Sequence, residues 1–326
     1  MFVLDSHCDT PTQIFRGRDL AKDNDKAHVD FPKIKRGGVD GAFFALYIPA
    51  DMEGEAAYEH ANKLYSCVVD TLAANPDKAA FAVTEKQAYD NKAKGLFSVF
   101  LGLENGSPIG TSLDRLHEFY DKGVRYLTLC HTKDNEICDS CASSVKTWHG
   151  LSPFGKELVA EMNRLGMLVD VSHISDEAFY DVLKYSTRPV VATHSCCRAL
   201  TNHPRNMTDD MIRALAEKGG VIQINFYPLF LDESFPEADM LTAPRPSYKM
   251  IVDHIDHVVE LVGIDHVGIG TDFDGIDVTP EGLENASMMP ALFEELRSRG
   301  YSDEDIEKIA SRNFFNVFSS SDEGRS

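Results

Sequence analysis

The sequence lacks any apolar run approaching the roughly 20 residues that a membrane-spanning helix requires. Polar residues Asp5, His7 and Asp9 interrupt the N-terminal segment MFVLDSHCDT, so it lacks the apolar core of a secretory signal peptide. Positive charge is also scarce, because 32 Lys and Arg face 52 Asp and Glu, and the formal net charge is −20. Nucleic-acid binding needs clustered cations, and no basic stripe is present. We therefore expect a soluble, cytoplasmic protein without a nucleic-acid or membrane partner.

The sequence also gives little support for disulfides or nucleotide binding. Its seven cysteines are an odd number and lie mostly in apolar runs, which suits a reducing compartment. Cys138 and Cys141 form a C-x-x-C, but the second pair that a zinc ribbon requires is missing. The glycines at 268, 270 and 275 match neither a dinucleotide-binding nor a Walker pattern. We expect free thiols throughout.

What is present is a regular alternation of apolar runs and helical stretches. Runs rich in Val, Ile, Leu and Phe predict eight strands, at residues 2–5, 41–47, 97–103, 124–130, 167–171, 189–193, 220–226 and 266–270. Such runs are typical of parallel strands covered on both faces. Helices are predicted at 55–75, 112–123, 152–166, 175–186, 208–220 and 247–263, several of them opened by Ser or Thr and closed by Gly.

This alternation predicts an α/β fold, a single (β/α)8 TIM-type barrel over residues 1–318. Two extra C-terminal helices are predicted at 287–299 and 303–318, followed by a disordered tail at 319–326. The less regular segments 16–40, 131–150 and 228–246 each follow a strand end. We expect them to form walls of a pocket.

Five apolar runs end in a residue that can bind a metal or carry a proton. The runs are FVLDSHCD, FSVFLGLEN, MLVDVSH, PVVATHS and HVGIGTDFD, and the residues are His7, Asp9, Glu104, His173, His194 and Asp272. In a closed barrel all parallel strands end on one face, so residues from most of the chain should meet in one pocket.

Five of these residues have the chemistry of a metal site. His7 and Asp9 project together, because alternate residues of a strand share a face. His173 and His194 end neighbouring strands, and Glu104 would be buried among them, where an ionised carboxylate is costly unless paired. Imidazole with carboxylate suits zinc, with manganese, cobalt or iron as alternatives. Because a catalytic zinc takes about three protein ligands, five ligands predict two zinc ions per chain with Glu104 as the bridge.

Further residues are candidates for binding substrate and moving protons. His131 ends the fourth strand and could stabilise an oxyanion. Arg205 could clamp a substrate carboxylate, with Arg198 as a competitor in the same loop. Asp272 could protonate a leaving amine or bind an ammonium group, and Asp274 could orient its neighbours. An ordinary strand-end histidine and a solvated arginine are the structural alternatives.

Taken together, these residues resemble the membrane dipeptidase (renal dipeptidase) family of dizinc peptidases. The resemblance covers nearly the whole chain, through DSHCDTP, KRGGVDGAFFALY, LGLENG, VRYLTLCH, FGKELVAEMNRLGMLVDVSHIS, PVVATHS, RNMTDD, GGVIQINFY, DHIDHVVELVGIDHVGIGTDFDG and RNFFNVF. The chain departs from the family at Asn105, where Gly is usual, and at 43–45, where FFA replaces a run containing Trp. Neither departure removes a ligand.

The resemblance implies a role for each candidate residue. One zinc would be held by His7, Asp9 and Glu104, and the other by Glu104, His173 and His194. His131 would bind the region of the scissile carbonyl, Arg205 the substrate carboxylate and Asp272 the moving proton or the amine, while Tyr227 would line the side-chain pocket. Family members look like dipeptide hydrolases that often accept a C-terminal D-residue, and some hydrolyse β-lactams. Secreted, lipid-anchored members carry leader and anchor signals that this sequence lacks, so we expect a soluble, bacterial-type relative.

We therefore predict a zinc metallodipeptidase in which a hydroxide held between two metals attacks the peptide carbonyl, with Asp272, His131 and Glu104 as catalytic residues. The expected partner is a dipeptide, and a homodimer is allowed for. One alternative is an amidohydrolase acting on cyclic amides, lactones, β-lactams or phosphoesters, although such enzymes more often begin with H-x-H. The other is a metal-stabilised binding protein without catalysis.

Overall fold

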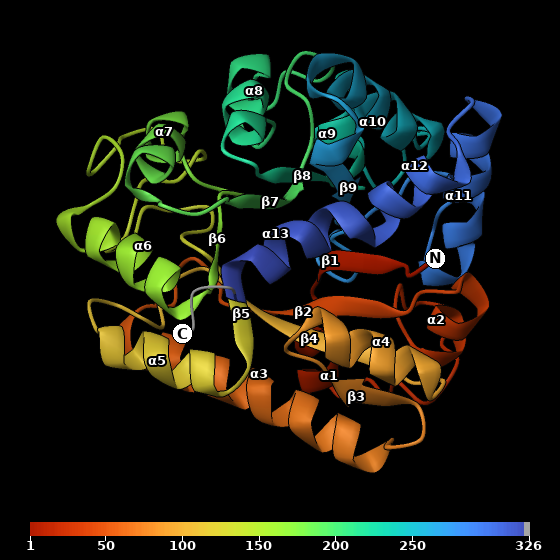
Figure 1. Ribbon diagram of the computed structural model, residues 1–326, viewed down its shortest axis with the longest axis horizontal. Coiled ribbons are helices and arrows are strands. Elements are labelled where there is room, and N and C mark those ends of the chain that lie inside the picture. Colours follow the sequence, from red (N-terminus) through yellow and green to blue (C-terminus); the bar gives the residue numbers. More distant parts are fainter. Residues whose placement is uncertain (323–326) are drawn as a thin grey trace.

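The computed structural model describes residues 1–322 and contains the predicted barrel (Figure 1). Eight parallel strands pair in the order β1-β2-β4-β5-β6-β7-β8-β9, and β3 pairs with β4 outside this path. Their bounds are β1 Leu4–Cys8, β2 Gly41–Tyr47, β3 Ala79–Phe81, β4 Phe97–Glu104, β5 Val124–Thr128, β6 Leu168–Asp170, β7 Val191–Ser195, β8 Val221–Ile224 and β9 Val267–Ile269. The ring closes where Cys8 bridges Phe273 and the Asp9 amide donates to the Phe273 carbonyl at 2.8 Å.

Helices surround the strands, as Figure 1 shows. The α-helices are α1 Thr10–Phe15, α2 Phe31–Gly37, α3 Gly54–Ala74, α4 Glu85–Ala93, α5 Leu113–Asp121, α6 Pro153–Leu165, α7 Asp176–Tyr185, α8 Asp209–Glu217, α9 Pro228–Leu231, α10 Lys249–Val262, α11 Met289–Ser298, α12 Asp303–Glu307 and α13 Asn313–Asp322. Short 3-10 turns lie at Glu237–Asp239, Ile264–His266 and Ala286–Met288, and a π-helical turn at Lys308–Arg312 joins α12 to α13. Several helix starts are capped as predicted: Ser175 accepts a hydrogen bond from the Ala178 amide and Thr208 from the Met211 amide.

The structure differs from the sequence prediction at several places. Helix α1 was not predicted, and helices α2 and α9 lie in the segments 16–40 and 228–246 that were expected to be irregular. Strand β1 covers Leu4–Cys8 instead of 2–5, because the buried Asp5 carboxylate is satisfied by the Thr271 hydroxyl at 2.6 Å. His7 therefore lies inside the strand. The short strand β3 and helix α4 were not predicted. Helix α13 continues to Asp322, so residues 319–322 of the predicted disordered tail are helical, and 323–326 lie outside the described residues.

The C-terminal helix α13 closes the amino end of the barrel. Phe314, Phe315 and Phe318 of α13 are buried with Phe43 and Phe100 of the strands, and the last two rings stack at 4.7 Å. Figure 1 shows α13 lying across this end. Burying large aromatic side chains is a strong stabilising contribution. The same cluster contains Tyr126, whose hydroxyl reaches the opposite side of the barrel interior.

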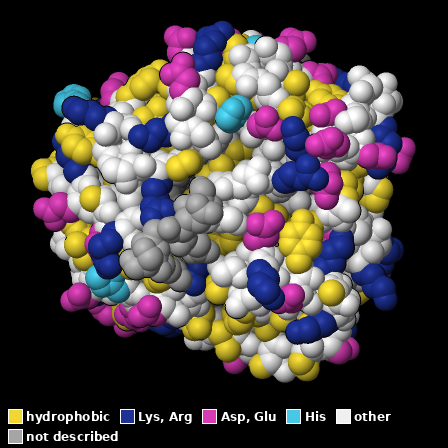
Figure 2. All heavy atoms as spheres, viewed as in Figure 1, with side chains coloured by type: hydrophobic (Ala, Val, Ile, Leu, Met, Phe, Trp, Pro, Cys, Tyr) yellow, Lys and Arg dark blue, Asp and Glu magenta, His cyan; other side chains and the backbone are white. Residues whose placement is uncertain are grey.

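The surface agrees with the composition. Figure 2 shows acidic side chains interspersed with Lys and Arg over the face that carries α13. Within residues 1–322, none of the helices combines the length and hydropathy needed to cross a membrane. All seven cysteines are free thiols, as predicted.

Candidate metal centre and active site

The predicted metal ligands meet at the carboxyl end of the barrel, around Glu104. Its Oε2 lies 3.4 Å from His7 Nε2. Its Oε1 lies 3.1 Å from His173 Nε2 and 3.5 Å from His194 Nε2. Each carboxylate oxygen thus faces a different histidine set, which is the arrangement a bridging carboxylate requires.

The same side chains fit metal ions by their burial and by their unpaired atoms. Asp9 Oδ2 lies 3.5 Å from His7 Nε2, and the Nε2 atoms of His173 and His194 are 2.8 Å apart. His7 Nε2 and Asp9 Oδ1 are buried without a hydrogen-bond partner. Such atoms are costly unless something binds them. Imidazole nitrogens and carboxylates converging on one point are ligands suited to zinc.

Three overlapping sets have all their ligand atoms within 4.8 Å of one another: His7–Glu104–His194, Glu104–His131–His173 and His7–Asp9–Asp272. They divide the ligands differently from the two zinc sites that the family resemblance implies. The two oxygens of Glu104 favour the division that the family resemblance implies, because a carboxylate binds metals through individual oxygen atoms. Asp272 and His131 lie close enough to join the first coordination sphere or to act beside it.

Hydrogen bonds to neighbouring side chains orient two of the candidate ligand histidines. His7 Nδ1 lies 2.7 Å from the Tyr126 hydroxyl, and His194 Nδ1 lies 2.8 Å from the Thr193 hydroxyl. Thr193 donates its own proton to Asp170 at 2.7 Å, so its oxygen accepts from His194. With the proton on Nδ1, each ring presents a lone pair on Nε2 to the centre. Sequence reasoning did not identify Tyr126, Thr193 or Asp170.

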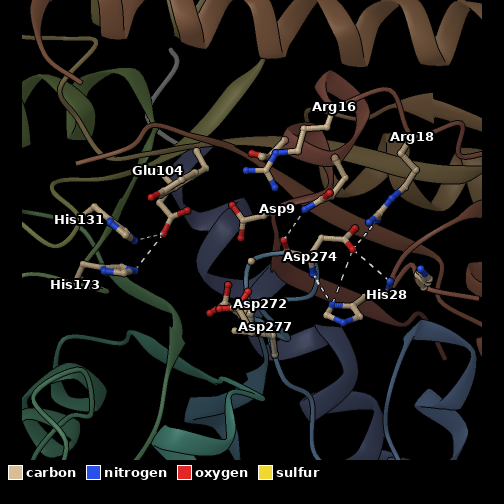
Figure 3. Close-up of a pocket in the computed structure, with 16 residues that line it drawn as sticks. Asp9, Arg16, Arg18, His28, Glu104, His131, His173, Asp272, Asp274 and Asp277 are labelled. Atoms are coloured by element: carbon tan, nitrogen blue, oxygen red, sulfur yellow. Dashed lines mark hydrogen bonds and ion pairs between the residues drawn. The ribbon is translucent and has the colours of Figure 1, made fainter. Parts of the chain in front are cut away.

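Three of the candidate ligands, Asp9, Glu104 and His173, line a cavity of about 490 Å³ (Figure 3). Its lining also includes His131 and Asp272, so the structure brings all three catalytic candidates, Glu104 included, together with candidate ligands. Figure 3 shows Glu104 between His131 and His173 on one side and Asp9 on the other.

Two predicted substrate-binding residues, Arg205 and Tyr227, are not among the residues that line this cavity. Arg205 is 8% exposed, donates to the His194 carbonyl at 3.0 Å, and has a buried Nε without a hydrogen-bond partner. Tyr227 is half-buried, and its hydroxyl contacts Met240 Sδ at 3.3 Å. The competitor Arg198 is held by Asp176, with both nitrogen–oxygen pairs within 2.8 Å. Arg198 is therefore a structural residue.

Comparison with known proteins decides the family. The family model of the membrane dipeptidases, peptidase family M19, matches residues 1–325. The chain belongs to this family. Over 307 residues it is 35% identical to the dipeptidase verJ of Clonostachys rogersoniana, covering 91% of this chain and 76% of that protein.

Solved membrane dipeptidase relatives share the fold. The probable dipeptidase PvdM from Pseudomonas aeruginosa superposes with a TM-score of 0.93 at 26% identity, covering 99% of this chain and 96% of that one. A metallopeptidase from Rhodobacter sphaeroides, solved with a phosphinate mimic of the dipeptide L-Ala-D-Ala, gives 0.90 at 28% identity and covers 98% of this chain and 99% of that one. The chain is therefore a peptide hydrolase of dipeptidase type on a TIM barrel. Family and ligand clusters together indicate that it uses metal.

Burial and neighbouring charges shift the pKa values of two residues that line the cavity, Asp272 and His131. Burial, followed by the negative charge of Asp9, raises the pKa of Asp272 to about 7, and Asn225 donates to its Oδ2 at 2.9 Å. Burial, followed by the positive charge of Arg205, lowers the pKa of His131 to about 3. A membrane dipeptidase with this site has a carboxyl group that can carry a proton near neutral pH and a neutral imidazole that can donate one hydrogen bond. Burial also lowers the pKa of His173 and His194 well below normal, which favours the neutral, metal-binding form.

The strand ends around the site have a strained backbone. His173, Asp272, Asp274 and Asn105 adopt positive φ values of 73°, 61°, 68° and 78°. Such conformations cost of order 1–3 kcal/mol each in a residue other than glycine and concentrate at functional sites. The φ of Asn105 is one that Gly adopts without strain, in keeping with the Gly that the family resemblance implies at this position. Asn tolerates this region better than most residues, and its Nδ2 donates to the Ile48 carbonyl at 3.1 Å.

Proposed function

We propose that this chain is a zinc-dependent dipeptidase that holds two zinc ions per chain and hydrolyses the peptide bond of dipeptides. The observation that carries the proposal is the orientation of Glu104, whose two oxygens lie 3.4 Å from His7 and 3.1 Å from His173. One metal would be held by His7, Asp9 and Glu104 Oε2, and the other by His173, His194 and Glu104 Oε1. Two zinc ions bound there would supply an activated water molecule and polarise the scissile carbonyl.

The other site residues have separate tasks in this reaction. His131 lies with its Nε2 3.9 Å from Glu104 Oε1, beside the metal ligands, and as a neutral donor it binds the carbonyl oxygen as negative charge develops there. Asp272 carries a proton near neutral pH and delivers it to the departing amine, or binds the substrate ammonium when ionised. Both roles, proton delivery and ammonium binding, can be performed by the single Asp272 carboxyl group that lines the cavity.

Arg205 is our candidate for the free carboxylate of the dipeptide. It is buried, its Nε has no hydrogen-bond partner, and its positive charge acts on both His131 and Asp272. A buried guanidinium with an unsatisfied donor suits a planar anion. Tyr227, whose ring packs on Phe230 at 5.0 Å, is the candidate for a side-chain pocket next to it.

We also propose that dipeptides with a C-terminal D-residue are accepted. The support is the Rhodobacter sphaeroides relative, which was solved with a mimic of L-Ala-D-Ala and is 28% identical over 98% of this chain. The homodimer and the cytoplasmic location stay predictions from the sequence.

The test is metal analysis combined with a substrate panel. Purified enzyme should contain about two zinc ions per chain, and chelation should abolish dipeptide hydrolysis until zinc is returned. L,L- and L,D-dipeptides are compared with lactones and cyclic imides, which the amidohydrolase alternative predicts as substrates. Full activity in metal-free protein, or turnover of the cyclic compounds alone, would overturn the proposal. A protein that binds zinc but hydrolyses nothing would be the non-catalytic alternative.

A further inference from the structure

Three cations line the active-site cavity, and all belong to the segment that follows strand β1. They are Arg16, Arg18 and Lys26. This segment was expected to form a pocket wall, but none of its cations was singled out from the sequence. In a chain with a net charge of −20, cations gathered at the active site need a reason.

One of these three cations, Arg18, already forms an ion pair within the protein. Arg18 Nη1 lies 2.6 Å from Asp274 Oδ1, and Asp274 Oδ2 accepts a hydrogen bond from Thr10 at 2.9 Å. The His28 amide also donates to Asp274, at 3.3 Å. Arg18 therefore fixes the segment to the loop after β9 and is not free to bind a ligand.

Arg16 and Lys26 differ from Arg18. Within residues 1–322, no side-chain hydrogen bond or ion pair joins the Arg16 guanidinium or the Lys26 ammonium to another residue. The place of Arg16 is nevertheless well defined, because it ends helix α1 and the next residue, Gly17, turns the chain with a φ of 96°. Figure 3 shows its guanidinium pointing into the cavity on the side of Asp9, whereas Arg18 turns to Asp274.

We propose that Arg16, assisted by Lys26, recognises an acidic side chain of the substrate, so that the preferred dipeptides contain Asp or Glu. This rests on the proposed dipeptidase function. There the terminal carboxylate is assigned to Arg205 and the amine to Asp272, which Figure 3 places across the cavity from Arg16. Because both termini of the dipeptide are then bound by other residues, Arg16 is left to contact a side chain of the substrate. A guanidinium binds a carboxylate through paired, charge-assisted hydrogen bonds that a neutral side chain does not offer.

The test compares kcat/KM for matched dipeptides, Ala-Glu against Ala-Gln and Glu-Ala against Gln-Ala, with L- and D-residues at the C-terminal position. The zinc-loaded wild-type enzyme should favour the acidic member of at least one pair. Arg16→Gln should lower that acid-to-amide ratio about tenfold, the low end for a charge-assisted hydrogen bond because this side chain is exposed. Arg16→Glu should shift the preference toward Ala-Lys.

The matched control is Lys22→Gln, which removes the same charge from the same segment. Lys22 pairs with Asp19 at 3.1 Å and lies outside the cavity lining, so the ratio should not change. Circular dichroism shows whether Arg16→Gln folds. If it does not, the acid-to-amide ratio of kcat/KM is measured for the wild type at increasing salt concentrations, and this ratio should fall as ionic strength rises.

The possible outcomes distinguish a failure of this inference from a failure of the proposed dipeptidase function. An unchanged ratio in Arg16→Gln, or equal losses for both members of a pair, overturns this inference while leaving the dipeptidase function standing. Equal losses would assign Arg16 to a group that all these dipeptides share, such as the terminal carboxylate, or to the electrostatics of the proposed metal ligands. Absence of hydrolysis of any dipeptide by zinc-loaded wild type overturns the proposed function itself.

Discussion

Replacing Tyr126 by Phe tests whether the hydrogen bond between Tyr126 and His7, inside the barrel, contributes to the affinity for zinc. The change removes one hydroxyl, 2.7 Å from His7 Nδ1, and leaves the aromatic ring in place. That ring packs 5.3 Å from Phe43, and its atoms lie where a Cβ on Gly102 would come within 2.1 Å. The space is therefore built for this ring, and Phe should occupy it unchanged.

The expected effect follows from what the hydroxyl does for His7. Without it, the buried Nδ1 loses its acceptor, which costs about 1–3 kcal/mol, and the Nε2 lone pair is no longer held toward Asp9 and Glu104. Loss of such an outer partner typically lowers metal affinity or activity by about 10- to 100-fold. We expect a drop of this size at the His7 site, with the His173–His194 site less affected.

The assay is a zinc competition titration combined with kcat/KM for a dipeptide. Tyr301→Phe is the matched control, because the Tyr301 hydroxyl donates to Asp256 at 2.6 Å, outside the cavity lining. It should lower stability slightly and leave zinc binding unchanged. Tyr126→Phe with both zinc affinities and kcat/KM within twofold of wild type would refute the reasoning, since the hydrogen bond would then have no role in placing His7.

Three further predictions follow from individual contacts. Asp272→Asn should lower kcat/KM by about 10²- to 10⁴-fold in steady-state assays, and a loss below about threefold would remove Asp272 from proton transfer. Burial lowers the pKa of His254 to about 4, so as the pH falls below 6.5 the unfolded chain takes up a proton that the folded chain refuses. The free energy of unfolding of the wild type should therefore fall by about 2 kcal/mol more than that of His254→Asn between pH 7 and pH 5. Urea unfolding at both pH values measures this, and an equal fall in the two proteins would contradict the prediction. A Cβ on Gly37 would meet the Ala286 carbonyl oxygen at 1.8 Å, so Gly37→Ala should destabilise by at least about 2 kcal/mol, and an unchanged denaturation midpoint would show that the two segments can separate freely.

The barrel could be predicted because covered parallel strands leave an apolar signature. The predicted strand 41–47 matches β2, and 97–103 matches β4 to within one residue. Strand β3 was missed because it has three residues and pairs only with β4 at the edge, so its conformation depends on that partner more than on its own pattern. Polar residues inside strands, such as Asp5, shifted the predicted start of β1.

The side chains that meet around Glu104 were predictable from the sequence, and the side chains that orient them were not. A histidine or carboxylate after an apolar run is a local signal, whereas the contact between Tyr126 and His7 joins residues 119 positions apart. Thr193 precedes His194 directly, yet its importance depends on Asp170, which lies one strand away. The absence of Arg205 and Tyr227 from the cavity lining likewise depends on loop packing, which local sequence does not encode.

The closure of the barrel between Cys8 and Phe273 has a consequence during synthesis. His7 and Asp9 are among the first residues made, but the segment that holds the Asp9 amide in place, and Asp272 with it, is made only after most of the chain. A chain stalled or cleaved before this segment would carry all five proposed metal ligands without the segment that holds the backbone of His7 and Asp9. Domains of this kind fold as units, so zinc loading should mark a finished chain, and truncated copies should remain without peptidase activity in the cell.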